Sequence, residues 1–447
     1  MTPPDELALL TDLYELTMVQ AYWAEGMYET ATFSLFSRRL PKNRNFLLAA
    51  GVNEALALVE QLHFSAGAVE YLQGQQVFQP GFLDWLTDWK FRGDIWALPE
   101  GTPFFENEPL LEVSAPLPEA QLLESLLMNQ VHLPTLLASK AVRVALAAAG
   151  RTVIDFGLRR MHGIDASLKA ARAFYLAGID ATSNVLAGRR YGIPLAGTMA
   201  HSYVEAYDRE LDAFRDFASI YEQPVLLIDT YDVAEGTRNV IRLAEELDSP
   251  RRIRGIRIDS GDLGSLARMV RGMLDEAGLR SVQIFVSGGL DEDEIERLVQ
   301  GSFPIDGFGV GTSMGVSEDA PALDIAYKLT AYAGTGRLKL SSGKSTLPCR
   351  KQVFRSLNSD GHANGDVIAK LDEDAPGEPL LVQVMHKGKP IGSSLESLET
   401  SRERARTRTA RLPPRVLALM PAEPPYPVEV SEALQKARRE VIERLES

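Results

Sequence analysis

Short apolar segments recur in the middle of the chain, and each is followed by a polar or glycine-rich turn and then by a helical pattern. These segments are residues 152–156, 195–199, 225–228, 253–258, 282–286 and 305–310. Repeated strand–turn–helix units predict a parallel sheet, because each helix returns the chain to the start of the next strand. We therefore expect an α/β fold with an irregular β/α barrel, and a doubly wound open sheet is the structural alternative.

The helix expected after the fourth segment, over residues 262–277, shows the pattern most clearly. Leucine, methionine and valine recur at helical spacing between residues 263 and 274 and form one apolar face. Ser260 or Asp262 can cap the start of this helix, and Gly278 can end it.

The hydrophobic pattern changes on both sides of this region. On the N-terminal side we expect a helix over residues 5–24, strands over 30–36 and 94–98, and two helices over 118–149, the second starting at Pro134. On the C-terminal side, residues 337–341, 351–357 and 367–371 have the pattern of strands in a smaller sheet. These strands could pair with the N-terminal ones, which would make that domain discontinuous.

The expected organisation therefore has three parts. They are a discontinuous α+β domain from residues 1–125 and 330–400, a β/α barrel catalytic domain over 126–329, and a C-terminal extension over 401–447. The arginine-rich residues 401–411 in this extension are interpreted as a solvated surface.

Composition narrows the class of protein. The chain has 447 residues, of which 45% are apolar, and its formal net charge of -14 argues against nucleic acids and anionic membranes as partners. No apolar stretch is long enough to span a bilayer, and the acidic N-terminus does not resemble a signal peptide. Cys349 is the only cysteine, which excludes an internal disulfide and fits a reducing compartment. We expect a cytoplasmic protein.

Residues suited to binding or catalysis follow almost every expected strand. They are Asp155 with Arg159, Asp180, Thr198 with His201, Asp229, Asp259 with Asp262, Ser287, and Gly309. The carboxyl ends of parallel strands meet at one face of a barrel, so these residues should lie together. Helix capping and salt bridges could explain any one of them, but the whole ring on one face indicates an active site.

Two glycine-rich turns follow the last two strands of the series. The candidate phosphate-binding residues are Ser287, Gly288, Gly289, Gly309, Gly311 and Thr312. Glycine lets the backbone approach a phosphate closely, and the N–H groups of such turns donate hydrogen bonds to it. Either turn alone is common for steric reasons, but the pair on consecutive late strands predicts phosphate binding.

Strand alternation places Arg257 and Asp259 on the same side of their strand. Together with Asp229, these acids could hold Mg²⁺, bind ribose hydroxyls or stabilise a cationic sugar; the other interpretation is pairing with nearby arginines. His201 lies just after a strand and at a helix start, which suits a nucleophile or a general acid/base. A lone histidine is, however, more often structural.

Seven motifs, in order, resemble those of the nicotinate phosphoribosyltransferase family, over nearly the whole chain. They are residues 11–14 (TDLY), 155–163 (DFGLRRMHG), 197–202 (GTMAHS), 229–232 (DTYD), 257–262 (RIDSGD), 287–290 (SGGL) and 309–312 (GVGT). In residues 348–353 (PCRKQV), which also resemble the family, Cys349 stands where we expect glycine.

The resemblance implies a type II phosphoribosyltransferase that makes nicotinate mononucleotide and pyrophosphate from nicotinate and phosphoribosyl pyrophosphate in NAD biosynthesis. It also implies Mg²⁺, coupled ATP hydrolysis through a phosphohistidine at His201, and a homodimer with shared active sites. The implied catalytic residues are His201, Asp229 and Asp259, and the implied Mg²⁺ ligands are Asp259 and Asp262. The implied substrate-binding residues are Tyr14 (from the other subunit), Phe156, Arg159, Asp180, Thr198, Arg257 and Asp262.

Three other functions stay open. A nicotinamide-specific relative shares several motifs, but Arg159 with Arg160, and Gly197 with Thr198 before His201, favour the nicotinate branch. A quinolinate enzyme would need more basic residues around a dicarboxylate. A barrel that binds a phosphorylated ligand without catalysis is a third alternative, against which the acids and His201 argue.

Overall fold

The computed structural model describes residues 4–247, 253–340, 346–392 and 396–447. Its contacts divide the chain into two compact units, Lys140–Asp319 and Met1–Ser139 together with Ala320–Ser447. We call the first the barrel unit and the second the framework unit. Residues 401–447, expected as a separate extension, are grouped with the framework unit. No helix of the described residues is long and apolar enough to cross a lipid bilayer.

The barrel unit contains a parallel sheet of six strands. They are β6 (Thr152–Asp155), β7 (Ala181–Thr182), β8 (Val225–Leu227), β9 (Gly255–Ile258), β10 (Gln283–Ser287) and β11 (Gly307–Val310), in the order β7-β6-β11-β10-β9-β8. The last strand, β11, pairs with the first, β6. This pairing belongs to a closing barrel and not to an open doubly wound sheet.

The barrel is irregular between β7 and β8. Residues 195–199 were expected to form a strand, but in the described structure only Leu195 makes a β-bridge, to Thr182. Pro194, which has no N–H group, precedes this segment, and Gly197 lies within it, and both residue types weaken strand pairing. This segment therefore runs as a loop towards His201.

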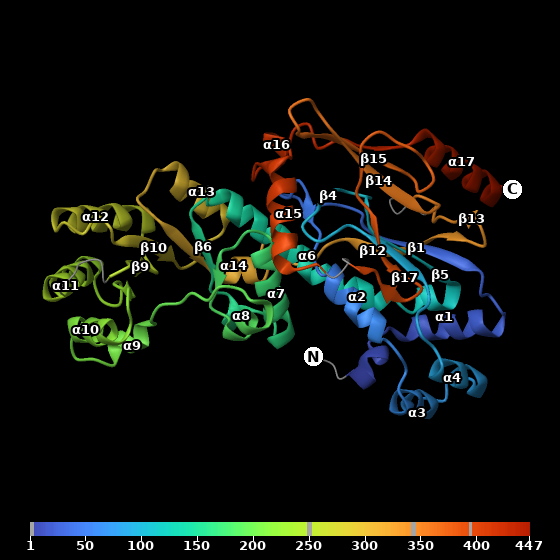
Figure 1. Ribbon diagram of the computed structural model, residues 1–447, viewed down its shortest axis with the longest axis horizontal. Helices are drawn as coiled ribbons and strands as arrows, with labels where there is room; N and C mark the ends of the chain where they lie inside the picture. The colour runs from blue at the N-terminus through green and yellow to red at the C-terminus, as the bar shows by residue number, and fades with distance from the viewer. Residues whose placement is uncertain (1–3, 248–252, 341–345, 393–395) are drawn as a thin grey trace. The chain divides into compact units, whose positions relative to one another are not determined.

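Helices follow the strands of the barrel unit (Figure 1). They are α7 (Ile164–Leu176), α8 (Val185–Tyr191), α9 (His201–Glu205), α10 (Glu210–Ile220), α11 (Val233–Glu246), α12 (Leu263–Glu276), α13 (Glu292–Gln300) and α14 (Thr312–Gly315). The helix expected over residues 262–277 is confirmed as α12, and Asp262 caps it by accepting a hydrogen bond from the Ser265 N–H.

The framework unit is built on a seven-stranded sheet that joins both ends of the sequence. Its order is β13 (Thr335–Gly336), β12 (Ile325–Tyr332), β1 (Thr30–Ser37), β5 (Pro109–Pro116), β3 (Asp94–Ala97), β17 (Val382–His386) and β18 (Lys389–Pro390). Antiparallel pairing of β1 with β12 and of β3 with β17 makes this domain discontinuous, as expected. The predicted C-terminal strands are not the ones that pair: residues 351–357 and 367–370 lie in a separate sheet, and residues 337–340 form no strand, while residue 341 lies outside the described residues.

Two smaller sheets complete this unit. One has the order β16 (Glu378–Pro379), β14 (Lys351–Leu357), β15 (Ala363–Lys370) and β19 (Val428–Val430), and the other pairs β2 (Leu47–Leu48) with β4 (Pro103–Phe104). Its helical segments are η1 (Pro4–Leu9), α1 (Leu13–Ala24), α2 (Val52–Gln61), α3 (Ala66–Gly74), α4 (Pro80–Thr87), α5 (Leu117–Gln121), the first part of α6 (Glu124–Ala147), α15 (Leu398–Ala410), α16 (Pro414–Leu417) and α17 (Glu432–Glu446).

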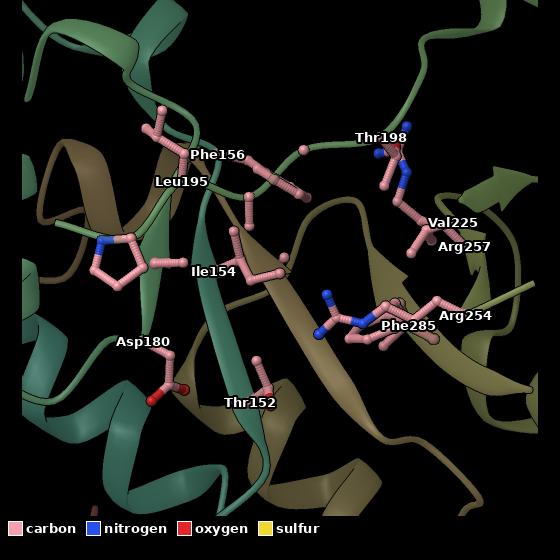
Figure 2. Close-up of a pocket in the computed structure, with 16 residues that line it drawn as sticks. Thr152, Ile154, Phe156, Asp180, Leu195, Thr198, Val225, Arg254, Arg257 and Phe285 are labelled. Carbon is pink, nitrogen blue, oxygen red and sulfur yellow. The ribbon is translucent and has the colours of Figure 1, made fainter. Parts of the chain in front are cut away.

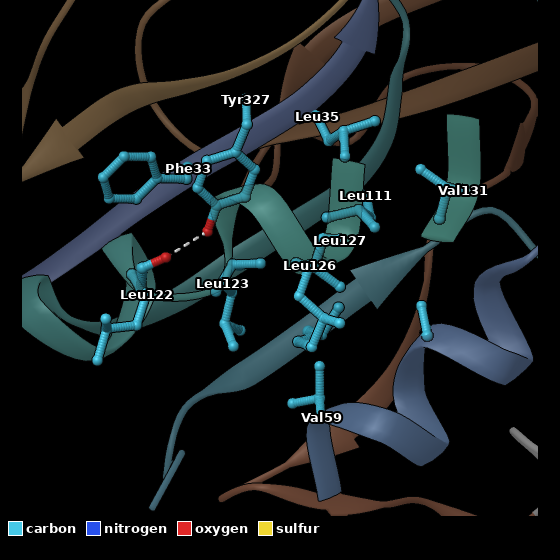
Figure 3. Close-up of a cluster of buried hydrophobic side chains, with 14 of the residues drawn as sticks. Phe33, Leu35, Val59, Leu111, Leu122, Leu123, Leu126, Leu127, Val131 and Tyr327 are labelled. Carbon is cyan, nitrogen blue, oxygen red and sulfur yellow. Dashed lines mark hydrogen bonds between the residues drawn. The ribbon is translucent and has the colours of Figure 1, made fainter. Parts of the chain in front are cut away.

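Aromatic and leucine side chains form the core of the framework unit (Figure 3). The rings of Phe33 and Tyr327 stack with their centroids 4.8 Å apart, and the Tyr327 hydroxyl donates to the Ala120 carbonyl over 2.7 Å. Leu123 and Leu127 pack into the same cluster. Burial of this apolar area is the main stabilising contribution to the unit.

Two helix predictions in this part of the chain were wrong. Residues 5–24 form η1 and α1 rather than one helix, because Asp12 adopts an extended conformation and its N–H bonds to Ser125. Pro134 does not start a helix but lies inside α6. The proline removes one helical hydrogen bond, yet buried leucines on both sides of it keep α6 continuous.

The arginine-rich residues 401–411, interpreted as a solvated surface, form most of α15. One face of this helix is buried through Ser401, Ala405 and Thr409. Arg404 pairs with Glu396 at 2.5 Å with its side chain 16% exposed, and Arg406 pairs with Glu403 at 2.6 Å. The helix is therefore part of the packed unit rather than only a solvated surface.

The backbone at Cys349 explains the glycine expected there. Its φ of 66° lies in the left-handed region, which glycine adopts without steric cost. The Cys349 N–H donates to Thr330 over 2.7 Å, and its carbonyl accepts from the Lys351 ammonium over 2.8 Å. These bonds hold a cysteine in a conformation that favours glycine.

A buried charged cluster links β14, β15 and the segment before β5. The Arg355 guanidinium binds the Asp366 carboxylate, which also accepts from the Tyr426 hydroxyl over 2.9 Å. Glu108 is fully buried beside this pair and accepts from the Phe105 N–H over 2.9 Å. Burial, with repulsion from Asp366, raises the pKa of Glu108 well above 4.5.

Replacing Glu108 with Gln should change how stability depends on pH. A raised folded-state pKa means that the wild type loses stability as pH rises from about 4.5 towards that pKa. Glutamine cannot ionise. The free energy of unfolding of the variant, relative to that of the wild type, should therefore increase by about 1.4 kcal/mol for each unit of pH in this window. Urea unfolding of both proteins across a pH series measures this, and parallel pH profiles would contradict it.

Candidate active site

A cavity of about 380 Å³ occupies the interior of the barrel unit (Figure 2). Its walls come from β6, β8, β9, β10 and β11 and from the loop of residues 194–198. Phe156, Thr198, Arg257 and Gly309 lie towards the carboxyl ends of the strands, where the predicted functional residues were expected. The cavity is therefore continuous with the predicted site.

Glycines in the barrel strands let two aromatic rings pack closely beside the cavity. A side-chain carbon on Gly309 would lie 2.5 Å from ring carbons of Phe156, and one on Gly307 would lie 2.9 Å from the ring of Phe285. Gly255, on the other side of Phe285, would meet the same ring at 3.0 Å. Branched side chains usually fill the interior of a barrel, whereas these glycines make room for the rings of Phe156 and Phe285.

Arg257 is the central cation of the site. Its guanidinium donates to Asp259 over 3.1 Å, to the Ser287 hydroxyl over 3.2 Å and to the Met199 carbonyl over 2.8 Å. The group also lies 5.9 Å from the centre of the Phe156 ring. Burial lowers the pKa of Arg257 while Asp259 opposes this effect, and arginine remains charged in such surroundings.

The acids at the ends of β8 and β9 contact each other. Asp229 accepts from the Asp259 N–H over 2.9 Å and from the Ser260 hydroxyl over 2.6 Å, both through Oδ2. Its other oxygen, Oδ1, is buried and has no hydrogen-bond partner among the described residues. The Ser287 hydroxyl donates to Asp259, which joins β10 to this group.

His201 lies at the first position of α9, beside these acids. Its Nδ1 atom is 3.1 Å from the Thr230 hydroxyl, and its Nε2 atom is 3.9 Å from Oδ2 of Asp259. The side chain is 40% exposed, so a soluble reactant can reach it. Thus the structure brings His201, Asp229 and Asp259 together.

The glycine turn after β10 packs directly against β9. Gly288 and Gly289 have φ values of 92° and 64°, and a side-chain carbon on Gly288 would lie 1.9 Å from the Asp259 carbonyl. The turn after β11 begins at Gly309 and leads into α14. The Ser313 hydroxyl donates to the Leu290 carbonyl over 2.6 Å and links the two turns.

Several predicted residues also have structural contacts. Asp262 caps α12, and hydrogen bonds from Ser265 lower the pKa of this carboxyl. Asp155 is buried and accepts from the Gly157 N–H and the Thr182 hydroxyl, so it shapes the strand end. Burial nevertheless raises the pKa of Asp155.

Other predicted residues lie apart from the two glycine turns. Asp180 lines the cavity just before β7, at the amino ends of the strands, and accepts from the Val153 N–H over 2.9 Å. Arg159 is exposed on the short helix η2 (Leu158–Arg160) and does not line the cavity. Tyr14 belongs to the framework unit, where it borders a separate pocket that also contains Ser125.

Arg254 and Phe285 line the cavity but were missed in the sequence. Figure 2 shows Arg254 extending into the cavity. Phe285 shares the strand alternation of Ser287, so the pattern could have placed it inside. Arg254 precedes the regular part of β9, and no periodic signal marks it.

Among the described residues, no group of three or more histidine, cysteine or acidic side chains is arranged to hold a metal ion. A Mg²⁺ ion that keeps most of its waters and binds substrate phosphates needs only one or two carboxylates. The acids beside the glycine turns are suited to this weaker mode, and the unpartnered Oδ1 of Asp229 fits a site that takes a further cation.

A barrel that combines glycine turns, a buried arginine and clustered carboxylates at its strand ends has the architecture of an enzyme for phosphorylated substrates. The model of the nicotinate phosphoribosyltransferase (NAPRTase) N-terminal domain matches residues 9–132, and that of the nicotinate phosphoribosyltransferase (NAPRTase) family matches residues 152–356. The chain belongs to the nicotinate phosphoribosyltransferase family.

Individual relatives agree with this assignment. The chain is 50% identical to nicotinate phosphoribosyltransferase pncB2 of Mycobacterium tuberculosis, with 96% of this chain and 92% of the relative covered. It is 41% identical to nicotinate phosphoribosyltransferase of Bacillus subtilis, with 84% of this chain and 79% of the relative covered. The crystal structure of human nicotinic acid phosphoribosyltransferase matches with a TM-score of 0.85 at 31% identity, covering 96% of this chain and 99% of that one.

Replacing Gly288 with Ala should destabilise the chain more than replacing Gly289 with Ala. Both variants carry the strain of a left-handed residue, about 1–2 kcal/mol, but only the first clashes with the Asp259 carbonyl. Urea unfolding of the two variants measures the difference. Equal free energies of unfolding would show that the close approach of the turn to β9 is not a constraint.

Proposed function

We propose that the chain transfers the phosphoribosyl group of phosphoribosyl pyrophosphate to nicotinate, giving nicotinate mononucleotide and pyrophosphate, as a step in NAD biosynthesis in the cytoplasm. One observation carries the proposal: a cavity with an aromatic ring and a fixed arginine opens beside two linked glycine turns. The first part suits a flat aromatic carboxylate, and the second suits a sugar phosphate.

The pyridine ring would lie on the part of the Phe156 ring that faces the cavity, and Gly309 makes room for that ring. Its carboxylate would meet Arg257, whose position is fixed by three oxygen partners before substrate arrives. Arg159 would act at the rim rather than inside the cavity, while Thr198 and Asp180 line its walls.

The 5′-phosphate would bind the backbone N–H groups of residues 287–289 and 309–312. The turns are linked through Ser313, so they can bind one group together. The pyridine nitrogen then attacks C1 of the sugar, the bond from C1 to the pyrophosphate oxygen breaks, and pyrophosphate leaves with the electron pair. C1 becomes cationic as this bond breaks, and the Asp259 and Asp229 carboxylates stabilise that charge.

Mg²⁺ would neutralise charge on the leaving pyrophosphate. Asp229 and Asp259 would be the direct ligands, Asp229 through its unpartnered Oδ1 and Asp259 through Oδ2, which lies on the side of His201. Asp262 already accepts two hydrogen bonds from Ser265, so it would act through a bound water.

We also propose that ATP phosphorylates His201. With Thr230 holding Nδ1–H, the lone pair of Nε2 attacks the γ-phosphorus and ADP leaves with the electrons of the broken P–O bond. The phosphoryl group would then lie near Asp259, and this repulsion favours its later hydrolysis by water. ATP hydrolysis would in this way drive nucleotide formation forward.

The active form is proposed to be a homodimer whose sites use both subunits. Exposed apolar side chains mark surfaces that a partner can cover. In the barrel unit Ile164 is 77% exposed and Val185 is 69% exposed; in the framework unit Leu13 is 59% exposed, beside the half-exposed Tyr14. Tyr14 from the partner would supply the second face of the pyridine site.

Replacing Arg257 with Gln should reduce the preference for nicotinate over nicotinamide. A charge-assisted hydrogen bond contributes about 1.5–3 kcal/mol, so KM for nicotinate should rise about 10- to 150-fold, while nicotinamide is little affected. A mass-based assay of product from each pyridine measures both.

The control is Arg242→Gln, which removes an exposed arginine paired with Glu235 on α11 and should leave turnover unchanged. If the wild type used nicotinamide faster than nicotinate, the proposed substrate would be wrong. Full binding of phosphoribosyl pyrophosphate without any turnover would instead indicate a non-catalytic binding protein.

Replacing His201 with Ala should abolish ATP hydrolysis and leave a slow transfer that ATP does not stimulate, because the phosphate acceptor is gone. ADP release and labelling of the protein by ATP with a labelled γ-phosphate measure the loss. His362→Ala, at an exposed histidine of the framework unit, serves as control. ATP hydrolysis by His201→Ala at the wild-type rate would rule out the phosphohistidine.

A further inference from the structure

A buried lysine outside the cavity contacts the chain that follows both glycine turns. Lys140 and Glu292 are each only 2% exposed, and their charged atoms are 2.5 Å apart. The same Lys140 ammonium lies 2.9 Å from the Asp319 carboxylate. Arg143, one turn further along α6, binds the second oxygen of Glu292 at 2.9 Å.

The two acids occupy corresponding places after the two turns. Glu292 is the first residue of α13, directly after residues 287–291. Asp319 follows α14, which begins where the turn at Gly309 ends. The Ser313 hydroxyl joins the turns to each other through the Leu290 carbonyl. One ammonium group on α6 therefore fixes both segments.

We propose that Lys140 is a positioning residue for phosphate binding: through Glu292 and Asp319 it fixes the spacing of the two glycine turns. This inference rests on the proposed function, because it assigns the turns to the phosphate of phosphoribosyl pyrophosphate. Lys140 does not line the cavity and does not touch the reacting atoms.

The physical reason lies in the flexibility of glycine. Gly288 and Gly289 have few conformational restraints of their own, so their N–H groups would lose entropy on binding unless the flanking segments were fixed. Buried ion pairs provide rigid anchors because water does not compete with them. Burial alone would raise the pKa of Glu292, but Lys140 and Arg143 hold it below its usual range, so the acid stays charged.

A purely structural cluster would explain the burial and the charges equally well, but it predicts different kinetics. Loss of a structural contact reduces stability and the amount of active enzyme, and leaves the KM of each substrate unchanged. Loss of a positioning contact raises KM for the phosphorylated substrate alone, because only that substrate uses the turns. The difference between the two KM values therefore separates the two roles.

The decisive variant is Lys140→Met, which removes the charge and keeps the length of the side chain. KM for phosphoribosyl pyrophosphate should rise about tenfold to 100-fold, since small displacements of binding groups have effects of this size. KM for nicotinate should not change, and Lys140→Arg should restore much of the loss. Lys169→Met is the matched control, because Lys169 pairs with Asp165 within α7 and touches neither turn.

Asp319→Asn is the second variant in case Lys140→Met does not fold. Its side chain is 17% exposed, and the change loosens only the segment after α14, so a smaller rise in the same KM is expected. Titration calorimetry with ribose 5-phosphate gives a readout that does not depend on turnover. An unchanged affinity in both variants, or an equal rise in both KM values, would overturn the proposal.

The calorimetric result also separates two kinds of failure. If the wild type does not convert nicotinate, the proposed function fails, yet weaker binding of ribose 5-phosphate by Lys140→Met would still support the positioning role. If nicotinate is converted and ribose 5-phosphate affinity does not depend on Lys140, the positioning role alone is wrong.

Discussion

The charged guanidinium of Arg257 inside the barrel is the constraint on which the arrangement of the site depends. Arg257 stays in the interior because Asp259, the Ser287 hydroxyl and the Met199 carbonyl accept its hydrogen bonds. A buried charge without such partners would be too costly, so these oxygens must converge on it. Their convergence draws the end of β10 and the loop before His201 towards β9.

The aromatic lining of the cavity is a second feature of the site. A barrel normally gains stability by filling its interior with branched side chains, whereas here Gly307 and Gly309 let the rings of Phe285 and Phe156 pack against the strands. The irregular segment between β7 and β8 likewise forgoes strand hydrogen bonds and in return delivers Thr198 and His201 to the site. The barrel unit thus contains a cavity where side-chain packing and strand pairing are incomplete.

Charged groups away from the cavity show the same rule. Lys140 with Glu292, and Arg355 with Asp366, are buried because each has a partner of opposite charge. Glu108 lies beside Asp366 and has no cation of its own. Its raised pKa favours the neutral acid, which avoids the cost of a buried charge. Paired charges fix segments in place, while an acid such as Glu108 makes stability depend on pH.

The sequence by itself determined the features that depend on neighbouring residues. Alternation and caps located most barrel strands and α12, and the ordered motifs at the strand ends indicated the family and where its candidate residues gather. Tertiary structure decided what depends on distant segments. It made α6 continuous through Pro134, turned residues 196–199 into a loop and placed Arg254 in the cavity.

Tertiary structure also decided which acids make structural contacts and which lie near His201. Asp155 and Asp262 hold a strand end and a helix start, whereas Asp229 binds the backbone N–H of Asp259, whose carboxylate lies beside His201. A residue's type and its place after a strand do not show which atoms will surround it. That depends on packing between strands distant in sequence, because only the folded parallel sheet brings their ends together.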